Sequence, residues 1–326
     1  VNGLIAKTTG LVTATITDGD MATLDGITLN TATGAASAHK LTITVSDSSA
    51  DAGKLLALDT KTSVAKTALV VNSIAITGTL ADAKKLYGTN QNATLTGLGN
   101  ETVTISDATL AAADLKALEA ATSKDVDVSA ATAITGGIAD VKAVYAKAGG
   151  GITGLGNENV TFTDSGAVDA GDIDTINAAT SGNITFGTTV TTIDGDLADI
   201  NKVVTAASAT TPTVDAAALA LKINPTDTGG LDISDVNTLA GKVTGVVKAS
   251  LKTSGDNVKL DKLIDATNGL VSGQEIAITV NTDANTNLTG NKTLGAADLI
   301  KLDNLTSGVV TIAGTATADT IEGTSA

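Results

Sequence analysis

The sequence of 326 residues contains no cysteine, no tryptophan and no arginine, and its aromatic residues are two tyrosines and two phenylalanines. Without cysteine the chain forms neither disulfide bonds nor thiolate metal sites, and without arginine it has no bidentate clamp for phosphate or carboxylate. Because 42% of the residues are hydrophobic but only 1% are aromatic, the core must consist of Ala, Val, Ile and Leu in thin layers. Such a core suits stacked repeats.

Histidine and positive charge are also scarce. His39 is the single histidine, so a His-dependent catalytic triad or a multi-histidine metal centre has too few residues, and we expect His39 to be a solvated loop residue. The net charge of -15 repels nucleic acids and anionic membranes, which predicts no nucleic-acid partner. No apolar run reaches the length of about 18 residues that a membrane span needs.

A long internal repeat organises the chain. The segment Thr96–Ser123 (TGLGNETVTISDATLAAADLKALEAATS) returns as Thr153–Ser181, with Gly99 and Gly156 lying 57 positions apart. A period of this length predicts a solenoid or an array of repeats.

Ten short helices are predicted from one marker, an Asp or Lys that is followed in nine of the ten cases by an apolar residue at the next position, and often again three residues later. The markers are Asp20, Lys54, Asp82, Asp114, Asp140, Asp172, Asp199, Asp235, Asp261 and Asp298, and the spacing between them alternates between long and short. We therefore predict an α/β solenoid of about ten strand-helix coils, in about five doublets of roughly 60 residues, as one domain over 1–326. One strand per coil would stack into a parallel sheet on one wall, with the helices on the other.

Strand and turn signals fit this plan. Alternating apolar residues predict strands in the long units at 41–45, 103–105, 160–162 and 276–280. In the short units an Ile-x-Gly step ends at Gly78, Gly136 and Gly195, where glycine permits a close backbone approach. Thr79 and Asp196 stand at N-cap spacing before the next helices. We expect inserted loops near 206–230 and 282–292.

Several motifs have two interpretations. The recurring helical Asp could form a column of calcium ligands, but a carboxylate in the first helical turn more often accepts from free N–H groups, and we favour that role. The turn Gly97–Glu101 and its copy Gly154–Glu158 enter strands and lack a following Lys-Ser/Thr, so they are turn-formers rather than phosphate loops. Tyr87 and Tyr145 repeat at one helical position, where a later repeat has Val204, which indicates core packing rather than ligand stacking.

The acidic loops are better calcium candidates, and they contain Asp107, Asp164 and Asp283. A hard cation such as Ca²⁺ needs about six or more oxygen ligands, which no single run of this sequence supplies. Any site would therefore combine several loops.

The C-terminal sequence GTATADTIEGT, Gly314–Thr324, resembles the segment that precedes the calcium-binding nonapeptide array of repeats-in-toxin (RTX) proteins. The Gly-Gly-x-Gly-x-Asp turns of that array are not found in this sequence. The doublets are similar to repeats in very large secreted surface proteins of cyanobacteria. The resemblance implies export from a bacterial cell, a cell-surface or matrix location and calcium dependence, and it adds Asp319 to the calcium candidates.

Taken with the lack of a convergent reactive cluster, these features predict a structural, non-enzymatic protein of a filament, surface layer or adhesin stalk. The alternative is a glycan- or host-binding module of an adhesin or phage fibre. An enzyme is the weakest reading, because no paired acids are flanked by the aromatics that sugar-cleaving grooves use. The last predicted strand, Val309–Ile312, has no helix after it. We expect both ends to be sheet edges that other sequence or another subunit covers, and we expect head-to-tail self-association into fibres or layers that calcium strengthens.

Overall fold

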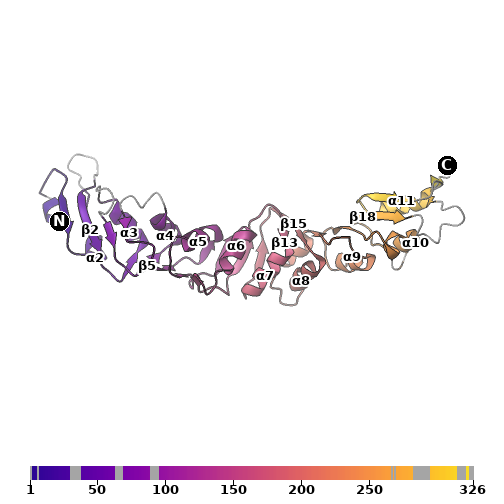
Figure 1. Cartoon of the computed structure of the whole chain (residues 1–326), viewed down its shortest axis with the longest axis horizontal. Coiled ribbons are helices and arrows are strands. Elements are labelled where there is room, and N and C mark those ends of the chain that lie inside the picture. Colours follow the sequence, from indigo (N-terminus) through magenta and orange to yellow (C-terminus); the bar gives the residue numbers. More distant parts are fainter. Residues whose placement is uncertain are drawn as a thin grey trace. The chain divides into compact units, whose positions relative to one another are not determined.

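The computed structural model describes residues 2–5, 7–29, 38–62, 69–88, 95–265, 267, 269–281, 294–313 and 321–322. It is a mixed α/β structure whose strands form several parallel sheets. The chain divides into two compact units, 1–160 and 161–326, and each is described by itself (Figure 1). The single domain over 1–326 stays a prediction.

The N-terminal unit alternates short strands with short helices. Its elements are α1 (Asn2–Ile5), β1 (Thr13–Ile16), α2 (Met21–Leu24), β2 (Lys40–Val45), β3 (Ser49–Asp51), α3 (Ala52–Asp59), β4 (Leu69–Val71), β5 (Ala75–Gly78), α4 (Leu80–Tyr87), β6 (Leu95–Thr96), β7 (Thr102–Ile105), β8 (Thr109–Ala111), α5 (Ala112–Glu119), β9 (Val126–Asp127), β10 (Ala133–Gly136), α6 (Ile138–Tyr145) and β11 (Ile152–Thr153). Strand β12 (Asn159–Phe162) lies at the boundary between the units.

The predicted helix positions are confirmed. Each of the ten markers lies in a helix or, for Asp20, at the residue that caps one. Helix α5 shows why these helices form: Ala112, Leu115 and Leu118 recur at intervals of three residues and are all buried. A helix of eight residues is marginal alone, so this apolar stripe holds it against the strands.

The strands of the N-terminal unit belong to several sheets rather than one. Among the described residues they pair in the orders β1-β2-β4-β6 and β3-β5-β7-β9-β11, with a further sheet that contains β8 and β10. The repeat at 69–87 contributes β4 and β5, whereas the repeat at 95–119 contributes β6, β7 and β8. The prediction of one strand per coil in a single sheet is therefore wrong. The additional strands are two or three residues long, too short to show alternation.

The parallel register aligns equivalent apolar residues of successive repeats. Ile43 lies opposite Leu69, and Val45 lies opposite Val71. All four side chains are buried, while Thr44 between them is exposed. Fully burying an aliphatic side chain of this size stabilises a fold by about 1.5–3 kcal/mol. Each added repeat therefore contributes stability through aliphatic side chains, without an aromatic residue at these positions.

The C-terminal unit continues the alternation with more irregular pieces. Its elements are β13 (Gly166–Asp169), α7 (Ala170–Ala179), β14 (Ile184–Phe186), β15 (Val190–Gly195), α8 (Leu197–Ala207), the 3₁₀ helix η1 (Ala216–Ala220), β16 (Lys222–Pro225), α9 (Ile233–Ala240), β17 (Lys248–Ser250), the 3₁₀ helix η2 (Gly255–Val258), α10 (Leu260–Leu263), β18 (Glu275–Asn281), β19 (Leu294–Gly295), α11 (Ala296–Leu305), β20 (Val310–Ala313) and β21 (Ile321–Glu322). Its parallel sheets have the orders β13-β15-β16, β17-β18-β20 and β19-β21.

The predicted loop at 206–230 is wrong. The segment holds the end of α8, the 3₁₀ helix η1 and strand β16, which pairs in parallel with β15. Pro225 occupies the last position of β16, opposite Gly195, where the missing N–H of proline does not interrupt the strand. The second predicted loop, 282–292, lies outside the described residues.

Candidate functional site

The Ile-x-Gly step packs against the first residue of the preceding helix. A Cβ atom added to Gly136 would lie 2.9 Å from the Cβ of Ala112, and one added to Gly195 would lie 2.9 Å from the Cβ of Ala170. Both alanines are fully buried. The predicted close approach is therefore confirmed, and it lets neighbouring repeats pack more closely than larger residues would allow.

The helices that follow this step begin at the predicted caps. The Thr79 hydroxyl accepts a hydrogen bond from the Asp82 N–H at 3.1 Å. The Asp196 carboxylate accepts one from the Asp199 N–H at 2.9 Å. Each of these bonds satisfies one of the N–H groups that a helix leaves without an intrahelical partner.

Another kind of capping group comes from the next repeat along the chain. The donor is the backbone N–H of the first helical residue, and the acceptor is a side-chain oxygen 24 to 30 residues later. The bonds join Met21 to Asp47 at 2.7 Å, Leu80 to Asp107 at 2.6 Å, Leu197 to Asp227 at 2.8 Å and Ile233 to Asn257 at 2.9 Å. We call these four bonds the capping seam. Each helix in the seam is completed by its neighbour.

Sequence reasoning missed the capping seam although a signal was present. Two of the acceptors, Asp47 and Asp107, stand at the end of similar tripeptides that follow a predicted strand, Val-Ser-Asp47 and Ile-Ser-Asp107. The tripeptide Phe-Thr-Asp164 has the same pattern. At Asp47 and Asp107 the pattern marks an acceptor directly after a long strand. It does not say which N–H group that acceptor meets.

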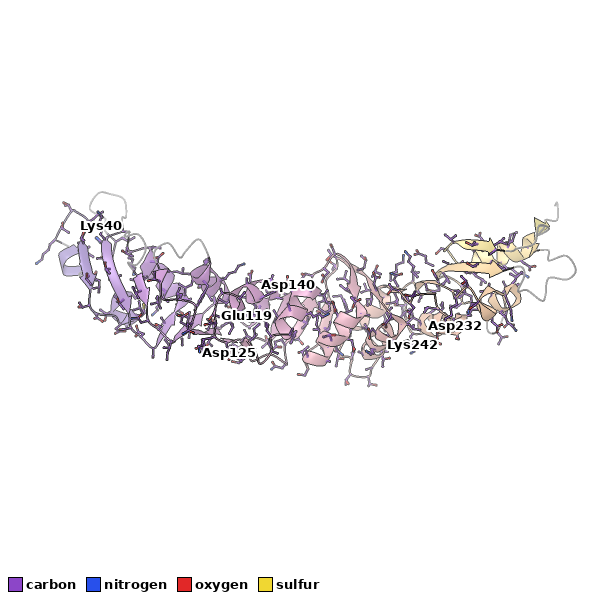
Figure 2. The ribbon with its side chains drawn as sticks, in the orientation of Figure 1. Lys40, Glu119, Asp125, Asp140, Asp232 and Lys242 are labelled. Atoms are coloured by element: carbon purple, nitrogen blue, oxygen red, sulfur yellow. The ribbon has the colours of Figure 1, made fainter. Side chains whose placement is uncertain are left out.

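Ion pairs join the helices of adjacent repeats. Lys84 on α4 pairs with Asp114 on α5, and Lys116 on α5 lies 2.5 Å from Asp140 on α6. Lys147 lies 2.8 Å from Glu119, which Figure 2 labels on α5. In the first two pairs the recurring helical Asp meets a lysine from the neighbouring helix rather than a second carboxylate.

The turns Gly97–Glu101 and Gly154–Glu158 contain a buried carboxylate. Glu101 is 2% exposed and Glu158 is fully buried. One oxygen of Glu101 accepts hydrogen bonds from the Gly99 N–H at 2.8 Å, the Asn100 N–H at 3.2 Å and the Tyr87 hydroxyl at 2.8 Å. Burial, and then the hydrogen bond and charge of Glu101, raise the pKa of Tyr87.

The second copy repeats this arrangement, because Glu158 accepts from the Gly156 N–H at 2.9 Å and from the Tyr145 hydroxyl at 3.0 Å. Gly97 and Gly99 both have positive φ, at 92° and 113°, as turn-formers do. The turn prediction is confirmed. The tyrosines do pack in the core, but each also ties a helix end to the turn that enters the following strand.

Two of the four calcium candidates, Asp107 and Asp164, lie among the described residues. Asp283 and Asp319 lie outside the described residues. Asp107 is half-buried, and its Oδ2 atom accepts from the Leu80 N–H. Asp164 is also half-buried, and its backbone carbonyl accepts from the Thr189 hydroxyl at 2.7 Å. Within the described ranges no three His, Cys, Asp or Glu side chains are placed to hold a metal ion, so calcium binding stays a prediction.

The expectation that His39 is solvated is wrong. Its side chain is fully buried, and Nδ1 accepts a hydrogen bond from the Val12 N–H at 3.1 Å. His39 directly precedes β2, and its backbone forms a parallel bridge with Thr62. The imidazole therefore serves as a backbone acceptor within the N-terminal unit.

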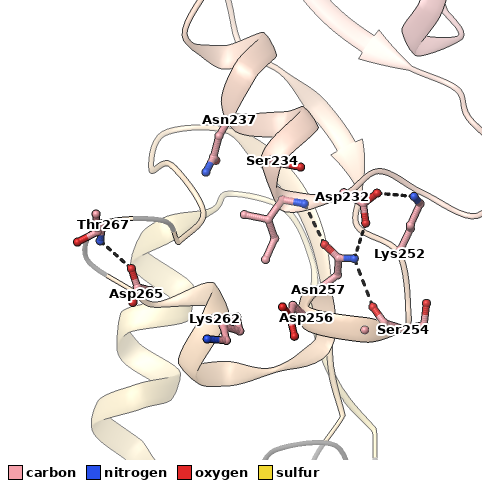
Figure 3. A pocket seen from close by; sticks show the side chains of 12 residues that line it. Asp232, Ser234, Asn237, Lys252, Ser254, Asp256, Asn257, Lys262, Asp265 and Thr267 are labelled. Atoms are coloured by element: carbon pink, nitrogen blue, oxygen red, sulfur yellow. Dashed lines mark hydrogen bonds and ion pairs between the residues drawn. The ribbon is translucent and has the colours of Figure 1, made fainter.

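A polar groove of about 980 Å³ lies in the C-terminal unit (Figure 3). Its lining comes from the start of α9, from the segment through η2 and from the end of α10: Asp232, Ile233, Ser234, Asn237, Lys252, Ser254, Gly255, Asp256, Asn257, Lys262, Asp265 and Thr267. Figure 3 shows these side chains around one opening. Ile233 is the only large apolar residue among them, but the groove exposes apolar carbon surface nearly as extensive as its polar surface.

One wall of the polar groove is held by Asn257, which is 7% exposed. Its amide accepts from the Ile233 N–H and donates to Asp232 at 2.9 Å and to the Ser254 carbonyl at 3.3 Å. Lys252 lies 2.5 Å from Asp232. The hydrogen bonds from Lys252 and then from Asn257 lower the pKa of Asp232, which keeps this carboxylate ionised.

No described helix has both the length and the apolar character needed to cross a membrane. No protein-family profile matches the chain, and comparison with curated proteins and with solved structures gave no match either. The functional conclusions therefore rest on the residues and geometry above.

Proposed function

We propose that this chain is a structural, non-enzymatic repeat protein of the bacterial cell exterior, a part of a filament, surface layer or adhesin stalk. In this proposal about ten strand-helix coils stack into a solenoid. The capping seam carries the proposal. A repeat whose helix is completed by a carboxylate 26 to 30 residues later is not a finished structure alone, and this is the defining property of stacked repeats.

The parallel register supports the same function. Strands of successive repeats pair residue by residue, as in Ala50 opposite Ile76 and Ile76 opposite Val103. A ladder of this type has no internal stopping point, so it can extend by adding equivalent units. The exterior location is supported by the RTX-like text at the C-terminus, of which only Ile321 and Glu322 lie among the described residues.

Head-to-tail contact between copies would extend the ladder from one molecule to the next. A contact between two different ends does not close on itself and generates a filament. The net charge of -15 opposes such stacking, and divalent cations between acidic loops would offset the repulsion more effectively than monovalent salt. Calcium is therefore proposed to strengthen assembly.

Negative-stain electron microscopy of the purified protein, with Ca²⁺ and with a chelator, tests this function. Fibres or sheets that are longer or more numerous in Ca²⁺ support both parts of the proposal. Equal assembly in both conditions would remove the calcium part. Discrete particles in both conditions, at high protein concentration, would overturn assembly itself.

A second candidate function is recognition of a glycan on a host or cell surface, and the polar groove favours it. A groove of hydrogen-bonding groups is what a hydroxyl-rich ligand requires, whereas a stalk needs none. A glycan array probed with the labelled full chain tests this candidate. Reproducible binding to a defined set of glycans would support recognition, and an array without signal would leave the structural function as the conclusion.

A further inference from the structure

We propose that the polar groove binds a neutral oligosaccharide directly, without a bridging cation. This inference rests on the second proposed function and assigns it a site and a ligand class. Five observations about the groove lead to it: its size, its lining, its charge, its fixed wall and its place in the repeat.

The size and the lining together limit the ligand. Small-molecule pockets usually measure about 300–1,000 Å³ and are mostly apolar. The polar groove, at about 980 Å³, has room for several sugar rings but presents a single large apolar side chain, that of Ile233. An apolar ligand would remove water from the exposed charged and hydroxyl groups of the lining without replacing the hydrogen bonds that water makes to those groups, at a cost in free energy. A hydroxyl-rich ligand satisfies them.

Charge selects a neutral ligand. The lining contains three carboxylates, those of Asp232, Asp256 and Asp265, and two ammonium groups, those of Lys252 and Lys262. Lys252 is engaged with Asp232, so it does not attract a phosphate, sulfate or sialic acid strongly. Among the described residues no acid trio exists to hold a cation. Mixed donors and acceptors with nearly balanced charge match the hydroxyl groups of a sugar, each of which both donates and accepts.

The fixed wall lowers the cost of binding. Asn257 holds Asp232, Ile233 and Ser254 in one network. On the opposite side of the opening, Asn237 donates to the Gly269 carbonyl at 2.8 Å and accepts from the Val271 N–H at 2.9 Å. Groups already held in place lose little conformational freedom when a ligand arrives. The groove therefore exists before the ligand binds.

The groove lies where the repeat pattern changes. In the other three bonds of the capping seam the acceptor is an aspartate, but here it is Asn257 in η2. Unlike a carboxylate, the amide also donates, and it thereby orients Asp232. The helix that follows, α10, has only four residues, which leaves the space that α9 and Thr267 enclose. Departures from a regular local pattern mark functional positions more often than regular ones.

Five exposed side chains of the lining lie outside the Asn257 network and can contact the ligand: Ser234, Asp256, Lys262, Asp265 and Thr267. Asp256 also pairs with Lys259 at 2.8 Å. Figure 3 shows Asp256 and Lys262 beside the same opening. No aromatic ring lines the groove to stack on a sugar face, so we expect millimolar rather than micromolar dissociation constants. Repetition of the chain along a fibre would compensate for weak single sites.

The test titrates the full chain with cellotriose, maltotriose, chitotriose and mannotriose in a chelator, using saturation-transfer NMR and calorimetry. Sialyllactose is the charged comparison. We expect at least one neutral trisaccharide to bind, and Asp256→Ala and Lys262→Ala each to weaken that binding by about tenfold, the effect of losing one hydrogen bond to a charged group. Asp298→Ala is the matched control, because Asp298 belongs to an exposed Asp-Lys pair of the same i,i+3 spacing as Asp256 and Lys259.

The outcomes separate this inference from the function on which it rests. The Asp256→Ala and Lys262→Ala variants could bind the glycan as tightly as the unsubstituted protein and unfold at the same transition. That result would overturn the assigned site but would leave glycan recognition as a function. Binding that requires Ca²⁺, or that prefers sialyllactose, would overturn the ligand class. No binding by any of the sugars, together with an empty glycan array, would overturn both.

Discussion

The Oδ2 atom of Asp107 lies 2.6 Å from the backbone nitrogen of Leu80, a residue 27 positions earlier in the chain. Leu80 is the first residue of α4, and it is buried. One repeat therefore supplies the acceptor that the helix of the preceding repeat needs. The same carboxylate is a calcium candidate from the sequence, so its replacement distinguishes the two roles.

Asp107→Ala is expected to lower the free energy of unfolding of the N-terminal unit by about 1–3 kcal/mol, because it leaves a buried N–H group without its acceptor. Asp107→Asn keeps an acceptor and should restore most of that loss. Urea denaturation followed by circular dichroism, in a chelator, measures both. The exposed Asp125 in the same unit provides the control, since Asp125→Ala should have little effect.

If Asp107 acted mainly as a calcium ligand, the result would differ. Both substitutions would then abolish a Ca²⁺-dependent gain in stability, and neither would matter in the chelator. Equal destabilisation by Asp107→Ala and Asp107→Asn in the chelator would also contradict the capping role, because only the alanine variant lacks the acceptor.

Gly136→Ala is expected to destabilise the protein by about 1–3 kcal/mol, the usual cost of overpacking a core, to which the φ of 159° at this glycine adds backbone strain. The added methyl group would lie 2.9 Å from the Cβ of Ala112, and both residues belong to packed repeats. Gly150→Ala is the control, because a Cβ there meets nothing within 4 Å. Combining Gly136→Ala with Ala112→Gly should recover part of the loss. A Gly136→Ala variant as stable as the Gly150→Ala variant would contradict the close contact.

How much of this structure was predictable depends on the range of the interaction. The helix positions and the caps at Thr79 and Asp196 follow from spacing within a few residues, and both predictions are confirmed. The partner of Asp107 depends on which strands pair and in what register. Neither the pairing nor the register is determined by nearby residues. The strands β6 and β8, which belong to different sheets, are also too short to show an alternating pattern.

The candidate site was less predictable than the fold. His39 was expected in solvent because single histidines in loops usually are, yet it is fully buried and accepts a hydrogen bond from the N–H of Val12, a residue 27 positions away. The polar groove depends on the shortness of α10, whereas its marker Asp261 predicted an ordinary helix. The spacing of the markers predicts where a helix begins, but it does not predict that α10 ends after four residues.

Tyr87→Phe is expected to make the stability of the N-terminal unit less sensitive to alkaline pH. The pKa of Tyr87 is raised in the folded state, so the folded protein keeps this proton at a pH where the unfolded chain, with a pKa of about 10, loses it. Stability from this group is complete below pH about 10 and falls as the pH rises further.

The free energies of unfolding of the wild-type protein and the Tyr87→Phe variant must be compared at the same pH, because lysines titrate in the same pH range in both proteins. At neutral pH, Tyr87→Phe should cost about 0.5–1.5 kcal/mol for the hydrogen bond to Glu101, which keeps its bonds from Gly99 and Asn100. Above pH about 10 the difference should shrink. Urea unfolding at both pH values measures it, and a difference that stays constant or grows would contradict the assignment.

The ion pair between Lys116 and Asp140 is expected to contribute little to stability despite its short distance of 2.5 Å. Both side chains are substantially exposed, at 53% and 33%, and exposed pairs usually contribute about 0.2–1 kcal/mol. A double-mutant cycle with Lys116→Ala and Asp140→Ala isolates the coupling between them. We expect a coupling below about 1 kcal/mol that decreases further in high salt, since screening reaches exposed charges first. A larger, salt-independent coupling would mean that the helix ion pairs, rather than the buried caps and the Gly-Ala contacts, hold neighbouring repeats together.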